Sequence, residues 1–230
     1  MLTMLVPKEQ RPGEKRVAAT PETVKALCGA GLTVTLEAGA GEAGGYHDAI
    51  FRDAGAQLMA TEALPWQDAD VVLSVAPPEP DCLARLKPGA LVVGLLEPYG
   101  AAERLQLLAD RGVSAVSMEL LPRISRAQSM DVLSSQANIA GYKAVLLAAA
   151  ALNRYVPMLM TAAGTIQPAR ALVLGAGVAG LQAVATARRL GAIVYVSDVR
   201  PAAKEQVESL GGRFIDPPAE QERPAEAGGY

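Results

Sequence analysis

Hydrophobic runs alternate with amphipathic stretches along most of the chain. The strongest candidates for buried strands are the short apolar runs at residues 71–73, 91–93 and 113–116. Between the last two, residues 101–109 have the apolar spacing of a helix, and Gly112 closes it. A repeated order of strand and helix requires right-handed crossovers, so the pattern predicts an α/β fold with parallel sheets.

The same order begins at the N-terminus. Residues 4–6 are a short apolar run, and a helical pattern opens at Thr20 and Pro21. Threonine can cap a helix, and proline suits the first turn because its missing amide hydrogen is not needed there. Gly31 ends this helix, and residues 32–36 then alternate apolar side chains with threonine, as a strand does.

The rhythm stops at residues 117–135, which are polar and have no clear period. Residues 136–155 then have the pattern of one long helix rich in alanine and leucine, which we interpret as the connection between two domains. Residues 158–168 are expected to form a loop. The predicted organisation is an N-terminal Rossmann-like domain, a connecting helix and loop, and a nucleotide-binding Rossmann domain, at residues 1–135, 136–168 and 169–230.

A glycine-rich motif opens the last of these regions. An apolar run at residues 171–174 leads into Gly175-Ala176-Gly177-Val178-Ala179-Gly180, and a helical pattern follows. This order is the signature of a dinucleotide-binding turn. The first glycine permits a tight turn, the second lets a pyrophosphate approach the backbone, and the third lets helix and strand pack closely. The amides at the helix start, including those of Val178 and Ala179, would face the phosphates. The alternative is a turn that binds nothing.

An acidic residue after the next strand bears on the choice of cofactor. Asp198 can accept hydrogen bonds from a ribose 2′-hydroxyl and would repel a 2′-phosphate, which favours NAD(H) over NADP(H). Arg200 leaves the choice open, because a nearby arginine can accommodate such a phosphate. Its alternative interpretation is a solvated arginine at a helix start, beside the adenine.

The polar segment before the long helix is a second candidate site. Arg123, Arg126, Gln128, Asp131 and Ser134 lie within twelve residues. Such a cluster beside a cofactor domain could hold the amide or carboxylate of a ligand. On composition alone, a solvated linker between domains is an equally good interpretation.

Composition and charge exclude several classes of function. The chain is 50% hydrophobic and only 4% aromatic, as in α/β proteins whose cores consist of small aliphatic residues. Its 21 basic and 24 acidic residues give a net charge of -3, so no basic excess attracts nucleic acid. Cys28 and Cys82 have the spacing of neither a zinc site nor a disulfide framework. No segment matches a signal peptide or a transmembrane helix, so we expect a cytoplasmic protein.

At these motifs the chain resembles the NAD(H)-binding components of proton-translocating nicotinamide nucleotide transhydrogenases, which share a family with alanine dehydrogenases. The most specific likeness is at residues 122–136, with the sequence PRISRAQSMDVLSSQ. It continues at residues 160–165, through the glycine turn, and at residues 197–200 and 204–212. The opening of the chain, from residue 6 to residue 21, resembles alanine dehydrogenases as well.

The resemblance implies that NADH binds between two Rossmann-like domains and that the polar segment clasps its nicotinamide. Arg123, Gln128, Asp131 and Ser134 would contact the dihydronicotinamide ring and its carboxamide, and Gln128 would reach toward NADP(H) on a separate partner domain. The implied chemistry is direct hydride transfer between two nicotinamides, carried by Gln128, Arg123 and Asp131. No acid or base is needed, which agrees with the single histidine, His47, being interpreted as structural.

The resemblance also implies the other contacts and the partners. Asp198, with Val199 and Arg200, would bind the adenosine ribose, and Tyr230 would belong to a mobile loop that closes over the nucleotide. The partners would be the NADP(H)-binding domain and the membrane subunits of the transhydrogenase. The chain would be a homodimer held peripherally at the inner face of the plasma membrane.

Two departures from the family patterns leave alternatives. Alanine dehydrogenases have a substrate-binding lysine after the strand at residues 71–75 and a catalytic histidine after the next strand, where this chain has Ala76-Pro77-Pro78 and Leu95-Leu96-Glu97. An alanine dehydrogenase is therefore the less favoured alternative. From residue 171 onward only one mononucleotide half is recognisable, so we expect the second Rossmann domain to be incomplete at its C-terminus. This leaves a non-catalytic NAD-binding module as a further alternative.

Overall fold

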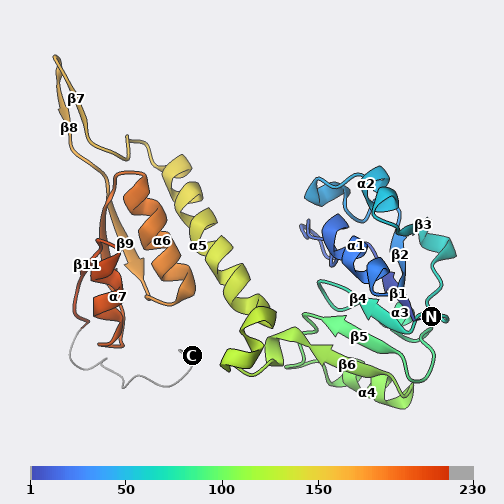
Figure 1. Ribbon diagram of the computed structural model, residues 1–230. Helices are drawn as coiled ribbons and strands as arrows, with labels where there is room; N and C mark the ends of the chain where they lie inside the picture. Colours follow the sequence, from blue (N-terminus) through green and yellow to red (C-terminus); the bar gives the residue numbers. More distant parts are fainter. Residues whose placement is uncertain (1, 218–230) are drawn as a thin grey trace. The chain divides into compact units, whose positions relative to one another are not determined.

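The computed structural model describes residues 2–217 of the 230-residue chain. The chain divides into two compact units, Met1–Pro122 and Arg123–Tyr230, each of which contains a parallel sheet and helices (Figure 1). The predicted α/β class is confirmed. The sequence predicted the domain boundary after residue 135, whereas in the structure residues 123–135 of the polar segment belong to the second unit.

The first unit contains a six-stranded sheet in which all paired strands are parallel. The strand order is β3-β2-β1-β4-β5-β6, so the chain order reverses between β1 and β4. In sequence order the strands are β1 (Thr3–Val6), β2 (Thr33–Glu37), β3 (Gln57–Met59), β4 (Val71–Leu73), β5 (Leu91–Gly94) and β6 (Ser114–Ser117). Ligands of open α/β sheets bind at such a reversal, beyond the carboxyl ends of the strands.

Helices cover both faces of this sheet. Strand β1 contributes Leu5 to one hydrophobic cluster and Met4 and Val6 to another, as expected when alternate side chains point to opposite faces. Thr20 caps α1 as predicted, since its Oγ1 accepts a hydrogen bond from the Thr23 amide at 3.3 Å. The helices are α1 (Pro21–Gly29), η1 (Glu42–Gly44), α2 (Asp48–Asp53), η2 (Thr61–Ala63), α3 (Pro80–Leu83), α4 (Ala102–Asp110) and η3 (Met118–Leu120), where η marks a 3-10 helix.

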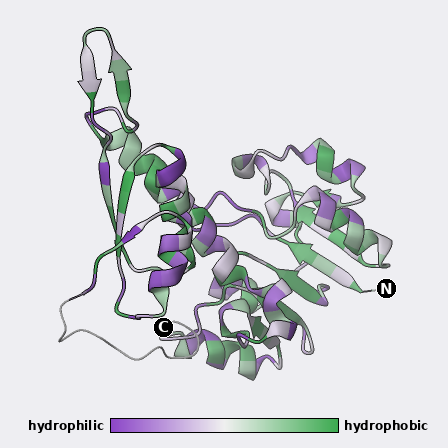
Figure 2. Cartoon of the chain, turned by 60° about the vertical axis from the view of Figure 1, so that its left-hand side comes forward, coloured by the Kyte–Doolittle hydropathy of each residue, from purple (hydrophilic) through white to green (hydrophobic). Residues whose placement is uncertain are grey.

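The second unit has a parallel sheet in the order β11-β10-β9 and a separate antiparallel hairpin. Its core includes Val184, Val194, Val196 and Val207, and each is almost fully buried. Hydrophobic residues predominate in the strands and mix with polar residues on the helices (Figure 2). Its elements are η4 (Ser125–Met130), α5 (Val132–Ala151), β7 (Leu159–Thr161), β8 (Gly164–Ile166), β9 (Arg170–Leu174), α6 (Val178–Arg189), β10 (Ile193–Ser197), α7 (Ala203–Ser209) and β11 (Arg213–Phe214).

Two expectations about the second unit were wrong in detail. The long helix begins at Val132 and ends at Ala151, rather than spanning residues 136–155. It starts four residues earlier than expected because the side chain of Asp131 caps it. The expected loop at residues 158–168 contains the hairpin formed by β7 and β8 (Figure 1). Its strands have no buried residue, so no alternation of buried and exposed positions marked them in the sequence.

Candidate functional site

The turn between β9 and α6 depends on three glycines. Gly175 has a φ of +94°, a conformation that L side chains rarely adopt. A Cβ added at Gly180 would overlap the carbonyl oxygen of Gly175, so helix and turn approach as closely as they do only because no side chain intervenes. A Cβ added at Gly177 would meet nothing within 4 Å. Thus the second glycine borders open space, where a ligand could reach the backbone.

The start of α6 offers unused hydrogen-bond donors. Its N-cap residue, Gly177, makes no side-chain capping bond. Helix geometry leaves the first amides, on Val178, Ala179 and Gly180, without acceptors inside the helix. Uncapped amides and the positive end of the helix dipole favour an anion such as a phosphate.

Asp198, which follows β10, faces this turn. Its Oδ2 accepts a hydrogen bond from the Ala176 amide at 2.6 Å, and its Oδ1 accepts one from the Arg200 amide at 2.8 Å. The Arg200 guanidinium completes the set, with Nε 3.0 Å from Oδ1 and Nη2 3.0 Å from Oδ2. The Arg200 side chain, helped by both amides, lowers the pKa of Asp198 to about 2. Asp198 is therefore ionised at neutral pH, and Val199 beside it is exposed.

The polar segment ends in the cap of α5. Asp131 Oδ1 accepts a hydrogen bond from the Ser134 amide at 2.9 Å, and Oδ2 accepts one from the Ser134 hydroxyl at 2.6 Å. The Ser134 hydroxyl and amide lower the pKa of Asp131, and the charge of Arg123 adds to this effect. Arg123 and Gln128 are both exposed. The structure thus joins Asp131 and Ser134 and leaves Gln128 facing solvent.

Helices α5 and α6 hold the polar segment and the glycine turn at the same end of the second unit. Gly141, in the middle of α5, lies against the backbone of Ala179 in the first turn of α6, and Pro157 after α5 lies against Gly191 after α6. The helices therefore run in parallel. Asp131 precedes Gly141 by ten residues, or about 15 Å at 1.5 Å per residue, so it lies beyond the start of α6. Sequence reasoning missed Gly141, although a glycine inside an alanine-rich helix was a visible signal.

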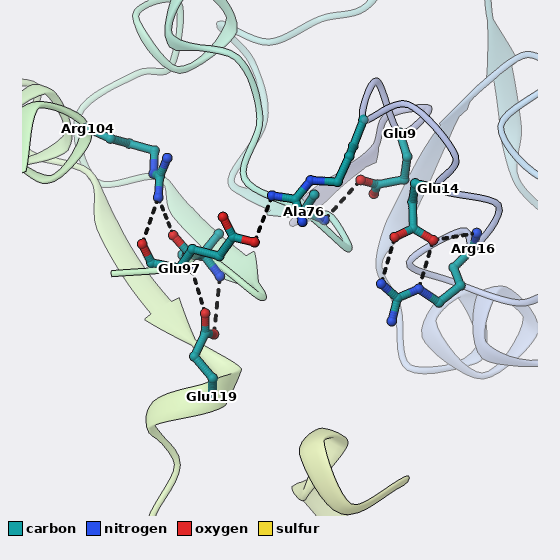
Figure 3. A network of polar contacts seen from close by, with 9 residues as sticks. Glu9, Glu14, Arg16, Ala76, Glu97, Arg104 and Glu119 are labelled. Atoms are coloured by element: carbon teal, nitrogen blue, oxygen red, sulfur yellow. Dashed lines mark hydrogen bonds and ion pairs between the residues drawn. The ribbon is translucent and has the colours of Figure 1, made fainter. Parts of the chain in front are cut away.

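The first unit also has a cavity, of about 410 Å³, at the carboxyl ends of β1, β4 and β5. Carboxylates of the unit itself accept hydrogen bonds from the main-chain amides there. Glu9 accepts hydrogen bonds from the amides of Val75 at 2.6 Å and Ala76 at 2.9 Å, and Glu119 accepts them from the amides of Leu96 and Glu97 (Figure 3). The amides at this edge are thus already paired with negative charge.

Three arginines at this edge are paired with groups of the unit itself as well. Arg11 pairs with Glu97 at 2.7 Å, and Arg104 donates to the carbonyls of Leu96 and Glu97. Arg16 binds Glu14 in a bidentate pair of 2.8 and 2.6 Å, which lowers the pKa of Glu14 to about 2 (Figure 3). Glu97 has a φ of 46°, the one positive value found among the described non-glycine residues. Its main chain is held there from both sides by Glu119 and Arg104.

Further candidate sites within residues 2–217 would involve the single histidine, groups of possible metal ligands or a membrane-spanning helix. His47 is exposed and lies 3.0 Å from Glu42. No group of three or more histidine, cysteine, aspartate or glutamate side chains in this range could hold a metal ion. No helix in it combines the length and hydrophobicity that crossing a membrane requires. Tyr230 lies outside the described residues.

Comparisons with known proteins agree along the whole chain. The family model described as alanine dehydrogenase/PNT, N-terminal domain, matches residues 5–140, and the corresponding C-terminal domain matches residues 144–227. An NAD(P) transhydrogenase alpha-subunit protein of Rhodospirillum rubrum is 51% identical over 100% of this chain and 61% of its own length. An alanine dehydrogenase of Halomonas elongata is 34% identical over 93% of this chain and 57% of its own length.

A solved structure supports the same relationship. The transhydrogenase from Sinorhizobium meliloti has a TM-score of 0.89 and 50% identity, covering 93% of this chain and 64% of that one. The chain thus spans about three fifths of the length of these relatives.

Proposed function

The chain belongs to the alanine dehydrogenase/PNT family, and on that basis we propose that it is the NAD(H)-binding component of a proton-translocating NAD(P) transhydrogenase. The observation that carries this proposal is the uncapped start of α6 beside the ionised Asp198. An anion site next to a carboxylate matches the pyrophosphate and ribose of NADH. The 51% identity to a transhydrogenase subunit over the whole chain supports the choice within the family.

The pyrophosphate would lie on the glycine turn, against Gly175, Gly177 and the amides of Val178, Ala179 and Gly180. Asp198 would accept hydrogen bonds from the adenosine ribose, with Val199 and Arg200 beside it. Three features support this assignment: the positive φ of Gly175, the open space at Gly177 and the ionised carboxylate. The role of Tyr230 in closing over the nucleotide stays a prediction.

The nicotinamide would lie at the polar segment, against Arg123, Gln128, Asp131 and Ser134. Asp131 and Ser134 are held together by two hydrogen bonds, so they would present a fixed surface to the carboxamide. The exposed Gln128 would lie between the two nicotinamides. Asp131 lies about 15 Å along the helix axis from Gly141, which is in contact with Ala179 at the glycine turn. An extended dinucleotide could therefore reach from this turn to the polar segment.

The reaction would move a hydride directly from C4 of the dihydronicotinamide of NADH to C4 of the nicotinamide of NADP+ on a partner domain. NADH is oxidised and NADP+ reduced by the same two electrons, and no proton is exchanged with the protein. The role of the protein would be to orient two rings, which can contribute much of a rate enhancement when the reacting atoms are held about 3–3.5 Å apart.

Membrane subunits would couple this transfer to proton movement. The chain would act as a homodimer at the inner face of the membrane.

The carboxyl edge of the first unit disfavours an alanine dehydrogenase. The substrate-binding lysine and catalytic histidine of that enzyme are expected near Ala76 and Glu97. Ala76 is buried, with its amide on Glu9, and Glu97 is paired with Arg11. At these two positions the edge therefore provides neither the lysine nor the histidine of that enzyme.

Mixing the chain with NADH and an isolated NADP(H)-binding domain loaded with NADP+ tests the proposal. NADPH should form only when both proteins are present, and alanine with NAD+ should give no NADH. Reduction of NAD+ by alanine without a partner would identify a dehydrogenase instead. NADH binding without either activity would leave a non-catalytic binding module.

A further inference from the structure

The carboxylate of Asp198 is saturated with hydrogen bonds from the protein itself. A carboxylate has about four acceptor positions, and Asp198 uses them for two main-chain amides and two guanidinium nitrogens. Its side chain is 6% exposed, against 29% for that of Arg200. Hydroxyl groups of a ribose therefore have no vacant position on Asp198 as the residue stands.

The four donors are not equally removable. The amides of Ala176 and Arg200 belong to the turns after β9 and β10 and are fixed by the backbone. The guanidinium is at the end of a flexible, partly exposed side chain. It contributes one hydrogen bond to each oxygen, from Nε to Oδ1 and from Nη2 to Oδ2. A ribose with free 2′- and 3′-hydroxyls offers two adjacent donors, which is the same number and distribution.

We infer that Arg200 is a specificity-determining residue that occupies the ribose-diol position on Asp198 until a nucleotide displaces it. The inference rests on the proposed binding of NADH at this site. The apparent affinity for NADH is then lowered by the fraction of protein in which the guanidinium still covers Asp198. A 2′-phosphate brings acceptors rather than donors, so it cannot replace the guanidinium on Asp198. The 2′-phosphate can pair with Arg200, but the negatively charged carboxylate of Asp198 then faces the phosphate.

The substitution Arg200→Ala distinguishes a residue that competes with the ribose for Asp198 from a residue that contacts the bound ligand. Titration of the chain with NADH should show binding about threefold to tenfold tighter than in the parent, the range for loss of a partly exposed bidentate pair. The gain should appear in the association rate, while the dissociation rate stays unchanged. Affinity for NADPH should fall, because the variant lacks the cation beside the 2′-phosphate.

Two further variants control for charge and for folding. Arg170→Ala removes the same charge from the opposite end of the same sheet, at the start of β9, and should leave both affinities unchanged. Arg200→Lys retains the charge but replaces the planar fork by a point donor, so it should give a smaller gain in NADH affinity. This variant keeps the test decisive if Arg200→Ala does not fold.

The outcomes distinguish this inference from the proposed function. Weaker or unchanged NADH binding in Arg200→Ala and Arg200→Lys would overturn the inference, as would an equal gain in Arg170→Ala. The proposed ribose site fails independently if Asp198→Asn binds NADH as tightly as the parent chain.

Discussion

At the scale of single residues, the carboxylate of Asp198 gives the most direct indication of which cofactor the chain binds. It is buried, ionised and aimed at the turn that precedes α6. The aspartate and the three glycines could be predicted from sequence because their spacing reflects a local geometry. The guanidinium on Asp198 could not, since the sequence does not show whether Arg200 turns toward its neighbour or toward solvent.

Asp198→Ala should weaken NADH binding by about tenfold or more, because one hydrogen bond to a charged acceptor contributes roughly 1.5–3 kcal/mol. It should also narrow the difference between NADH and NADPH, since the charge that repels a 2′-phosphate is gone. Parallel fluorescence titrations of the two cofactors measure both effects. Equal affinities of the parent chain for NADH and NADPH would contradict the assigned selectivity.

Gln128→Asn should slow hydride transfer strongly while NADH affinity changes little. The side chain is exposed and neutral, so its expected contribution is to the orientation of two rings rather than to the binding of one. Single-turnover rates in a mixture with the NADP(H)-binding domain, together with NADH titrations, separate the two quantities. Unchanged transfer would mean that the polar segment is only a linker.

Glu14 should make the first unit sensitive to acid. Arg16 lowers its folded pKa from 4.5 to about 2, so its stabilising contribution is complete above about pH 4.5 and is lost as the pH falls toward 2. Glu14→Gln should lower the free energy of unfolding at pH 7 by about 0.5–2 kcal/mol, because solvent screens the half-exposed arginine, and the variant should lose less stability than the parent between pH 5 and 3. Urea denaturation at pH 7, 5 and 3 measures both effects. Glu103→Gln, on the exposed face of α4, is the matched control, and an equal effect there would refute the assignment.

At the scale of elements, patterns of burial explain what sequence could and could not predict. The strands at residues 71–73 and 91–94 were recognisable because their apolar side chains cover both faces of a parallel sheet. The start of α5 was missed because Asp131, Ser134 and Ser135 read as loop residues, although the first of them is a cap. The hairpin of β7 and β8 was missed because nothing in it is buried.

The crossing of α5 and α6 should tolerate no side chain at Gly141. A Cβ there would overlap the carbonyl oxygen of Ala179, so Gly141→Ala should destabilise the second unit by about 1–3 kcal/mol, as overpacking does. It should also weaken NADH binding, since Ala179 belongs to the first turn of α6. Denaturant titration and NADH titration measure the two effects.

Gly29→Ala is the control for helix propensity at the Gly141 position. Gly29 is also helical, and a Cβ added there would meet nothing within 4 Å. This variant should be neutral or more stable by up to about 1 kcal/mol. Equal behaviour of the two variants would mean that the helices do not meet as the structure shows.

At the scale of the whole molecule, two units of the same architecture differ at their carboxyl edges. In the first unit, Glu9 and Glu119 occupy the amides after β4 and β5. In the second, the amides at the start of α6 carry no side-chain cap. An anionic cofactor therefore finds open donors in the second unit and carboxylates in the first. Sequence alone could not establish this difference, because it depends on side chains meeting amides far away in the chain.

The most direct test of the central claim follows the hydride itself. NADH deuterated at C4, on the face from which the hydride leaves, is mixed with the chain and with an NADP(H)-binding domain loaded with NADP+. The account predicts that deuterium appears at C4 of NADPH without exchange with solvent, and that the transfer requires the chain. NADPH formed without the label, or no NADPH while NADH stays bound, would contradict direct transfer between two nicotinamides.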